Sequence, residues 1–283
     1  MTPLTDYLVL DVFSDTAFGG NPLAVIPDAG ALPEAALQQI AREFNFSETV
    51  FIYPPKDPAH TARLRIFTPT MEIPFAGHPT VGAAVALAQR GHGPDMVLEL
   101  GVGPLAAHAT PRHASFTTDV PLEVLAHPPA PLVARALGLP EAAICRQTHA
   151  PVLATLGLPF TLTELHSRAA LAACTPETAA FREGAARFQG ALDFAQFAYV
   201  RSGQSLHARM FAPLDNIPED PATGSACATL GAYLAALSAK PLTLTIWQGE
   251  DMGRPSKITV KAQDTGVTLT GAAVKTMQGQ LCL

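Results

Sequence analysis

The sequence has few cysteines and few charged residues. Its four cysteines lie at positions 145, 174, 227 and 282, and none forms a C-x-x-C pair. This spacing is not typical of a zinc site or a disulfide framework, and it is compatible with a reducing compartment. Charged residues make up 15% of the chain, and the 18 Lys and Arg are scattered among 24 Asp and Glu. Because no basic stripe forms, we expect neither nucleic acid nor a membrane surface as a partner.

Signals for nucleotide binding, metal binding and export are also missing. The chain contains neither G-x-G-x-x-G nor a Walker sequence. Its nine histidines never form an i, i+4 pair on an expected helix, so we expect no metal and no organic cofactor. The N-terminus lacks the basic and apolar regions of a signal peptide. These features favour a cytoplasmic protein.

One uncharged segment needs to be distinguished from a membrane span. The nineteen residues 221–239 carry no charge, which is close to spanning length. They include a proline, two glycines and several Ser and Thr, and they are rich in alanine rather than leucine. This composition favours a buried core helix that is apolar on all sides.

One short sequence occurs twice in the chain. Residues 65–69 read Arg-Ile-Phe-Thr-Pro, and residues 209–213 read Arg-Met-Phe-Ala-Pro. An Ile-Pro pair begins four residues after each proline, and each copy then reaches a glycine and a polar residue, Gly77-His78 and Gly224-Ser225. An apolar helix of small residues is expected next, over 78–90 and over 225–239. The alternative is a chance likeness of two strand–turn–helix units.

The repeat predicts two homologous lobes, because a period of half the chain is too long for a solenoid. A proline-rich segment at 121–131 favours a lobe boundary there. We expect residues 1–122 plus about 274–283 in the N-terminal lobe and 123–273 in the C-terminal lobe. Strand-like runs outnumber helices, which predicts an α+β fold. In each lobe a mostly antiparallel sheet or barrel would wrap around a central apolar helix, with the site in a cleft between the lobes.

Glu48 is the first candidate for chemistry. It is the single carboxylate in the segment Phe44–Phe51, between aromatic and β-branched residues. Apolar flanks desolvate a carboxylate and raise its pKa, which suits a group that takes and returns a proton near neutral pH. The alternative is a glutamate at a strand edge that faces water.

Two further candidates lie at the starts of the apolar helices. His78 follows Gly77 in the positive field of a helix N-terminus, which should hold the imidazole neutral, unless it simply caps the helix. At the second helix, the backbone N–H groups of Gly224 and Ser225 could bind an anion, matching those at Gly77-His78. Two such sites facing each other would hold a small carboxylate-bearing molecule.

The side chains around the second helix start have an alternative role as caps. Asp220, Thr223 and Ser225 are all residue types that cap helices. A fourth polar segment is the turn Gly19-Gly20-Asn21-Pro22, whose Asn21 could point into the cleft. No G-x-S-x-G elbow is present, so nothing favours a Ser-His-Asp triad.

The assembled segments resemble the phenazine-biosynthesis PhzF-like isomerase family, part of the diaminopimelate-epimerase fold group. The motifs run in order as YLVLDVFSDTAFGGNPLAV, FNFSETVF, GHPTVGAA, DPATGSA and the terminal β segment, covering essentially the whole chain. The resemblance implies two similar lobes, each a sheet around a central helix. It also implies roles for individual residues. Glu48 would be the acid–base residue, His78, Asp220 and Ser225 would line the site, and the backbone at Gly77 and Gly224 would receive a carboxylate.

We therefore expect a cofactor-free isomerase that moves a proton within a small carboxylated metabolite, acting as a homodimer. Related epimerases and racemases use two opposed thiols. Here neither residues 76–78 nor residues 221–224 include a cysteine, and Cys227 has no counterpart on the facing side. Two alternatives stay open. One is an epimerase or racemase with Glu48 and Asp220 as opposed carboxylates, and the other is a non-catalytic metabolite-binding or scaffold protein of the same fold.

Overall fold

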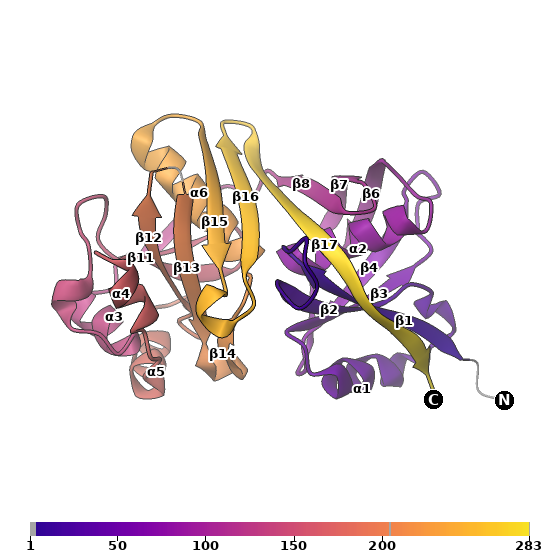
Figure 1. Cartoon of the computed structure of the whole chain (residues 1–283), viewed down its shortest axis with the longest axis horizontal. Helices are drawn as coiled ribbons and strands as arrows, with labels where there is room; N and C mark the ends of the chain where they lie inside the picture. Colours follow the sequence, from indigo (N-terminus) through magenta and orange to yellow (C-terminus); the bar gives the residue numbers. More distant parts are fainter. Residues whose placement is uncertain (1–3, 204, 283) are drawn as a thin grey trace. The chain divides into compact units, whose positions relative to one another are not determined.

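The computed structural model describes residues 4–203 and 205–282 (Figure 1). The chain divides into two compact units, Met1–Thr118 with Thr268–Leu283, and Asp119–Val267. The boundaries expected from the sequence, after 122 and after 273, lie a few residues further along the chain. The second boundary differs because strand β17 (Gly266–Leu281) is one continuous strand that leaves the second unit and enters the first. The change of unit therefore falls inside a strand, where no loop marks it.

The first unit is a β-barrel closed by the last strand of the chain. Strands β1 and β2, β3 and β4, β6 and β7, and β7 and β8 pair antiparallel, while β2–β3 and β4–β6 are parallel. Strand β17 pairs with both β8 and β1, which closes the ring. The strands are β1 (Thr5–Val12), β2 (Asn21–Ile26), β3 (Glu48–Tyr53), β4 (Ala62–Phe67), β6 (Asp95–Leu100), β7 (Gly103–Ala109) and β8 (His113–Thr118).

Helix α2 (Gly77–Gln89) runs among these strands and is buried from Gly77 to Ala88 (Figure 1). Its small residues follow from that burial. A Cβ atom on Gly82 would lie 2.4 Å from Leu23 Cδ2 and 2.9 Å from Val12 Cγ2. A helix that is buried on all sides has no polar face, which explains the uniformly apolar sequence.

The second unit follows the same plan. Its strands pair in the order β9–β10–β11–β12–β13–β15–β16, with β11–β12 and β13–β15 parallel and the other pairs antiparallel. Helix α6 (Gly224–Ser238) packs on β10, β11, β15 and β16. The strands are β9 (Glu123–Ala126), β10 (Val152–Thr155), β11 (Pro159–Glu164), β12 (Gln196–Ser202), β13 (Ser205–Ala212), β15 (Leu242–Gln248) and β16 (Ser256–Gln263).

The predicted internal repeat is confirmed by this topology. Each unit contains the same series of elements. Two parallel strands are followed by a third strand antiparallel to the second, then by a short strand and the central helix. The strand after the helix pairs parallel with the third strand. The first copy is β2, β3, β4, β5 (Glu72–Ile73), α2 and β6, and the second is β11, β12, β13, β14 (Ile217–Asp220), α6 and β15. Both central helices begin and end one residue earlier than expected. The structure thus has the expected pseudo-repeated lobes, each with a sheet around a central helix.

The repeated Arg-x-Phe sequence has the same local structure in both units. Arg65 forms a two-pronged pair with Glu72, with N···O distances of 2.8 and 2.6 Å, and its guanidinium lies over the Phe67 ring. Arg209 repeats this with Glu219, at 2.7 and 2.8 Å, over the Phe211 ring. In each unit this arginine–glutamate pair joins a long strand, β4 or β13, to the short strand that comes next in the chain, β5 or β14. The arginine and phenylalanine of the repeat are therefore structural.

Smaller elements cover the outside of the units. Helix α1 packs Leu37, Ile40 and Ala41 against Ile26, Phe51 and Phe67. The remaining helical segments are η1 (Ala29–Ala31), α1 (Glu34–Phe44), α3 (Ala130–Ala136), η2 (Glu141–Ala143), α4 (Arg168–Ala172), α5 (Thr178–Arg187), η3 (Pro213–Asp215) and η4 (Glu250–Met252). Within residues 4–203 and 205–282, no helix has both the length and the apolar character needed to cross a membrane. Within segment 221–239, residues Gly224–Ser238 form helix α6 of the second unit.

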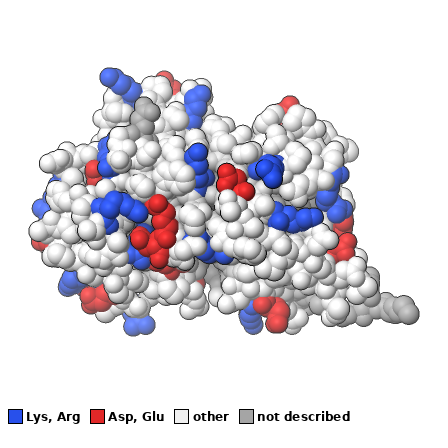
Figure 2. Space-filling view, viewed as in Figure 1, with Lys and Arg blue, Asp and Glu red and all other residues white. Residues whose placement is uncertain are grey.

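Charged side chains on the visible face do not gather by sign. Figure 2 shows Lys and Arg intermingled with Asp and Glu, with wide uncharged areas between them. No continuous basic stripe is seen on this face. That nucleic acid is not a partner stays a prediction.

We expect Gly82→Ala to destabilise the protein, although alanine usually favours a helix. The added Cβ would overlap Leu23 and Val12, and overpacking of this kind lowers the free energy of unfolding by about 1–3 kcal/mol. Urea unfolding measures the change. Gly30→Ala is the matched control, because a Cβ there meets nothing within 4 Å. A Gly82→Ala protein as stable as the control would contradict the packing described here.

Candidate active site

The first unit brings Glu48 and His78 together. Glu48 is the first residue of β3, and His78 is the second residue of α2. His78 Nδ1 lies 3.3 Å from Glu48 Oε2. The histidine side chain is 4% exposed and the glutamate 16% exposed, so both groups lie at the edge of the barrel interior. Residues separated by about thirty positions in the sequence thus lie next to each other.

The barrel register explains why Glu48 faces the helix. Glu48 is paired in register with Leu23 on the parallel strand β2, so the two side chains share one face. Leu23 on that face packs against Gly82 of α2. The same face therefore presents Glu48 to the start of the helix rather than to water, as the alternative interpretation would have it.

Asn21 lies on the same face, two residues before Leu23, and is completely buried. A tight turn places it there. Gly20 has φ +64°, and a Cβ atom at this position would lie 2.3 Å from Val12 O. Only glycine can occupy that position, which accounts for the Gly-Gly-Asn sequence. Asn21, Glu48 and His78 consequently lie at the end of the barrel where β2, β3 and α2 all begin.

The imidazole of His78 is neutral, and burial is the cause. Burial lowers the pKa of His78 from 6.5 to about 3. The neutral state agrees with the expectation from the sequence, and desolvation accounts for it. One ring nitrogen therefore carries a hydrogen and the other accepts. Nε2 is buried and has no hydrogen-bond partner among the described residues.

In the second unit, the predicted residues surround the turn before α6. Asp220 ends β14 and is 5% exposed. The Thr223 hydroxyl donates to Asp220 Oδ2 at 2.5 Å. Gly224 is the first residue of α6 and is buried, and Ser225 is half-buried beside it. Asp220, Gly224 and Ser225 are thus neighbours within one short segment.

The side chains at the two N-cap positions do not bond to the helices they precede. The N-cap position of α2 is Ala76, and that of α6 is Thr223, and neither helix receives a hydrogen bond from its cap side chain. The Thr223 hydroxyl donates to Asp220 instead. The side chains of Ala76 and Thr223 therefore do not occupy the backbone N–H groups at Gly77-His78 and Gly224-Ser225. Anion binding there, and a shared cleft for the two helix starts, stay predictions.

Gln248 and Ser256 support the turn that carries Asp220, and the sequence interpretation missed both. Both are fully buried and hold the turn before α6. Gln248 bonds to the backbone of Asp220 and Thr223, and the Ser256 hydroxyl donates to Pro221 O at 2.8 Å. A signal did exist for Gln248. Its strand alternates, and the glutamine is in phase with the inward-facing Leu244 and Ile246. An amide at an inward position predicts a buried hydrogen-bonding role.

The thiol nearest to the site is held protonated. Burial, followed by the charge of Asp220, raises the pKa of Cys227 well above its usual value. Its Sγ lies 3.9 Å from Gln248 Oε1. A protonated thiol cannot take up a proton, so Cys227 is disfavoured as a catalytic base.

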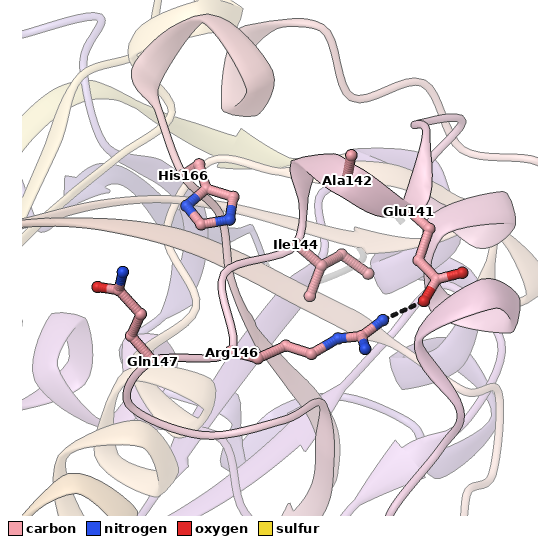
Figure 3. A pocket seen from close by; sticks show the side chains of 6 residues that line it. All are labelled: Glu141, Ala142, Ile144, Arg146, Gln147 and His166. Carbon is pink, nitrogen blue, oxygen red and sulfur yellow. Dashed lines mark hydrogen bonds and ion pairs between the residues drawn. The ribbon is translucent and has the colours of Figure 1, made fainter.

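A hollow on the second unit contains none of the predicted site residues. It has a volume of about 550 Å³ and is lined by Glu141, Ala142, Ile144, Arg146, Gln147 and His166 (Figure 3). Arg146 crosses it to pair with Glu141.

Among residues 4–203 and 205–282, no three His, Cys, Asp or Glu side chains are grouped to hold a metal ion. Cofactor independence stays a prediction.

The buried His78 should make stability depend on pH. Its pKa in the folded protein, about 3, lies below the ordinary 6.5. Below pH 6.5 the unfolded chain takes up a proton that the folded protein does not. The free energy of unfolding should therefore decrease as the pH is lowered below 6.5, by up to about 1.4 kcal/mol per pH unit from this one group. Urea unfolding at pH 6 and pH 4.5 should show a flatter dependence in His78→Gln. The exposed His92→Gln is the control, and equal slopes in all three proteins would contradict the assignment.

Comparison with known proteins identifies the family. Residues 10–279 match the family model PhzC-PhzF, described as phenazine biosynthesis-like protein. An uncharacterized isomerase of Mesorhizobium japonicum is 38% identical, covering 98% of this chain and 98% of that protein. The trans-2,3-dihydro-3-hydroxyanthranilate isomerase of Pseudomonas fluorescens is 33% identical, covering 95% of this chain and 94% of that protein.

Solved structures agree with the fold. A predicted epimerase from Pseudomonas aeruginosa superposes with a TM-score of 0.83 at 31% identity, covering 99% of each chain. A hydroxyproline epimerase from Agrobacterium vitis superposes with a TM-score of 0.65 at 15% identity, covering 98% of this chain and 91% of that one, which shows the fold alone. The fold is the diaminopimelate-epimerase-like fold that the resemblance implied. The chain therefore belongs to the phenazine biosynthesis-like PhzC-PhzF family and is an enzyme of the isomerase class.

Proposed function

We propose that this isomerase moves a proton within a small carboxylated metabolite without a cofactor, with Glu48 as the acid–base residue. The observation that carries the proposal is the pair formed by Glu48 and the neutral His78 at the start of α2. A carboxylate held at the edge of an apolar interior is a stronger base than one in water, because desolvation disfavours its charge. This is the property that a residue needs to take and return a proton near neutral pH.

The proposed reaction has two proton transfers. The Glu48 carboxylate removes a proton from a carbon next to an unsaturated or carbonyl group, and the electrons of that C–H bond delocalise into the neighbouring π system. The protonated Glu48 then returns the proton to another carbon on the same face, and a new C–H bond forms there. No electrons are gained or lost overall. A carboxylate working without a metal needs an activated C–H, so allylic and α-amino positions are favoured.

The other site residues would bind the substrate and stabilise the transition state. His78, whose Nδ1 lies 3.3 Å from Glu48 Oε2, would bond a polar substituent of the substrate through Nε2. Asp220 would hydrogen-bond a second substituent. The backbone N–H groups at Gly77 and at Gly224-Ser225 would receive the substrate carboxylate and stabilise negative charge that develops in the transition state. Asn21 would complete the binding residues at the barrel end.

The names of the relatives suggest where to begin with substrates. The Pseudomonas fluorescens relative is named for trans-2,3-dihydro-3-hydroxyanthranilate, a small carboxylate. We propose this compound and its close analogues as first candidates. A homodimer and a cytoplasmic location, expected from the sequence, belong to the same proposal.

An epimerase is the second candidate function. The similarity to a predicted epimerase from Pseudomonas aeruginosa favours it. In that case Glu48 and Asp220 would act as opposed acid and base, and the product would carry solvent deuterium with inversion at one carbon. An isomerase using Glu48 alone would instead place solvent deuterium at a different carbon from the one that lost the proton. NMR of a product formed in D₂O separates the two.

Glu48→Gln should abolish turnover while leaving the fold intact. Removal of a general acid–base group costs on the order of 10²- to 10⁴-fold in rate. The substrate candidates above provide the assay, with proton exchange in D₂O as the readout. Glu43→Gln, at an exposed position on α1, is the matched control and should keep its activity. A Glu48→Gln protein with near-normal rates would show that the base is another residue.

Exhaustive chelation followed by dialysis should leave the rate unchanged. Every step above uses only side chains and backbone groups of the chain. The same assay before and after treatment with a strong chelator measures this. Activity that disappears and returns with a divalent ion would overturn cofactor independence, without affecting the assignment of Glu48.

A further inference from the structure

The amide of Gln248 is buried against the turn that carries Asp220. Gln248 is the last residue of β15 and has no exposed surface. A buried amide is costly unless its hydrogen bonds are made. Both of its polar atoms bond to the segment from Asp220 to Thr223, which directly precedes α6.

The orientation of this amide is dictated by the backbone on either side. Oε1 lies 3.0 Å from Thr223 N, and Nε2 lies 2.7 Å from Asp220 O. A backbone N–H can only donate and a carbonyl can only accept. Rotating the amide by 180° would set donor against donor and acceptor against acceptor. The assignment of nitrogen and oxygen is therefore determined by the contacts themselves.

This orientation decides the direction of the next hydrogen bonds. Nε2 of Gln248 also lies 3.0 Å from the Thr223 hydroxyl oxygen. Because Nε2 can only donate, the hydroxyl accepts there and must use its single hydrogen elsewhere. Asp220 Oδ2 is 2.5 Å away. A hydrogen bond this short is typical of an ionised acceptor. Hydrogen bonds thus run one way, from Gln248 through Thr223 to the carboxylate.

We propose that Gln248 is a positioning residue that, acting through Thr223, keeps Asp220 ionised and fixes the direction of its carboxylate. This rests on the proposed function, which places Asp220 in the site. Donation of a hydrogen bond to the charged form of a carboxyl favours that form. Asp220 is thereby held as an acceptor for a donor group of the substrate, and it is less suited to deliver a proton as the opposed-carboxylate epimerase would require.

The same turn offers a matched control. Ser256 donates to Pro221 O at 2.8 Å, one residue from Asp220, and its hydroxyl bonds to neither Asp220 nor Thr223. Ser256→Ala removes one buried hydrogen bond from the turn and leaves the path from Gln248 to Asp220 intact. An effect of Thr223→Val that Ser256→Ala does not share is therefore specific to the carboxylate.

Carboxyl-carbon NMR titration tests the proposal without any substrate. The Asp220 signal is assigned as the one that is missing in Asp220→Asn. In Thr223→Val, which has nearly the same shape but no hydroxyl, the titration midpoint should move to higher pH by about one unit, a tenfold change in proton affinity. Gln248→Met should move it in the same direction. Thr223→Ser, which keeps the hydroxyl, and Ser256→Ala should both stay at the wild-type midpoint.

Each outcome bears on one of the two proposals. An unchanged midpoint in folded Thr223→Val or in folded Gln248→Met would overturn the role of Gln248, whatever the activity of the protein. A shifted midpoint together with full activity of Asp220→Asn on the identified substrate would leave Gln248 as a positioning residue and remove Asp220 from the proposed function. If both hold, the acid limb of the kcat/KM profile should move in Thr223→Val and return in Thr223→Ser.

Discussion

The structure depends on one packing constraint, which is that each unit holds a helix against its own sheet with almost no space between them. In the first unit the helix lies inside a closed barrel, and at Gly82 not even a methyl group fits. The closed ring excludes water from the helix start. Burial is also what makes His78 neutral, so the chemistry of that residue follows directly from the packing. Loss of tight packing would therefore change protonation as well as stability.

The two units share a scaffold but differ in chemistry. The arginine forks of Arg65 and Arg209 hold the same two strands in each copy. At the helix start, however, the first unit presents a carboxylate next to a neutral imidazole, and the second presents a carboxylate bonded by a hydroxyl. Under the proposed function, the carboxylate of the first unit would move the proton and that of the second would accept a hydrogen bond from the substrate. Such a division is consistent with an isomerase in which a single residue carries the proton.

The polar groups of the site are controlled by three different physical means. His78 is controlled by desolvation, and Cys227 by desolvation together with the charge of Asp220. Asp220 receives a directed hydrogen bond from Thr223, whose own direction depends on Gln248. The side chains of the N-cap residues of α2 and α6 do not bond to the first backbone N–H groups of these helices.

The sequence by itself determined the repeat, the two apolar helices and the candidate residues at their starts, because periodicity and small-residue composition are local properties. It also carried the family resemblance, through motifs that each lie within a short segment. Only the tertiary structure decided that Glu48 meets His78, since that contact depends on the parallel register of β2 and β3. The roles of Gln248 and Ser256 were likewise decided by folding, because they reach the turn before α6 from distant strands. The unit boundary inside β17 was hidden for a related reason: a continuous strand has the same local pattern on both sides of the point where its partners change.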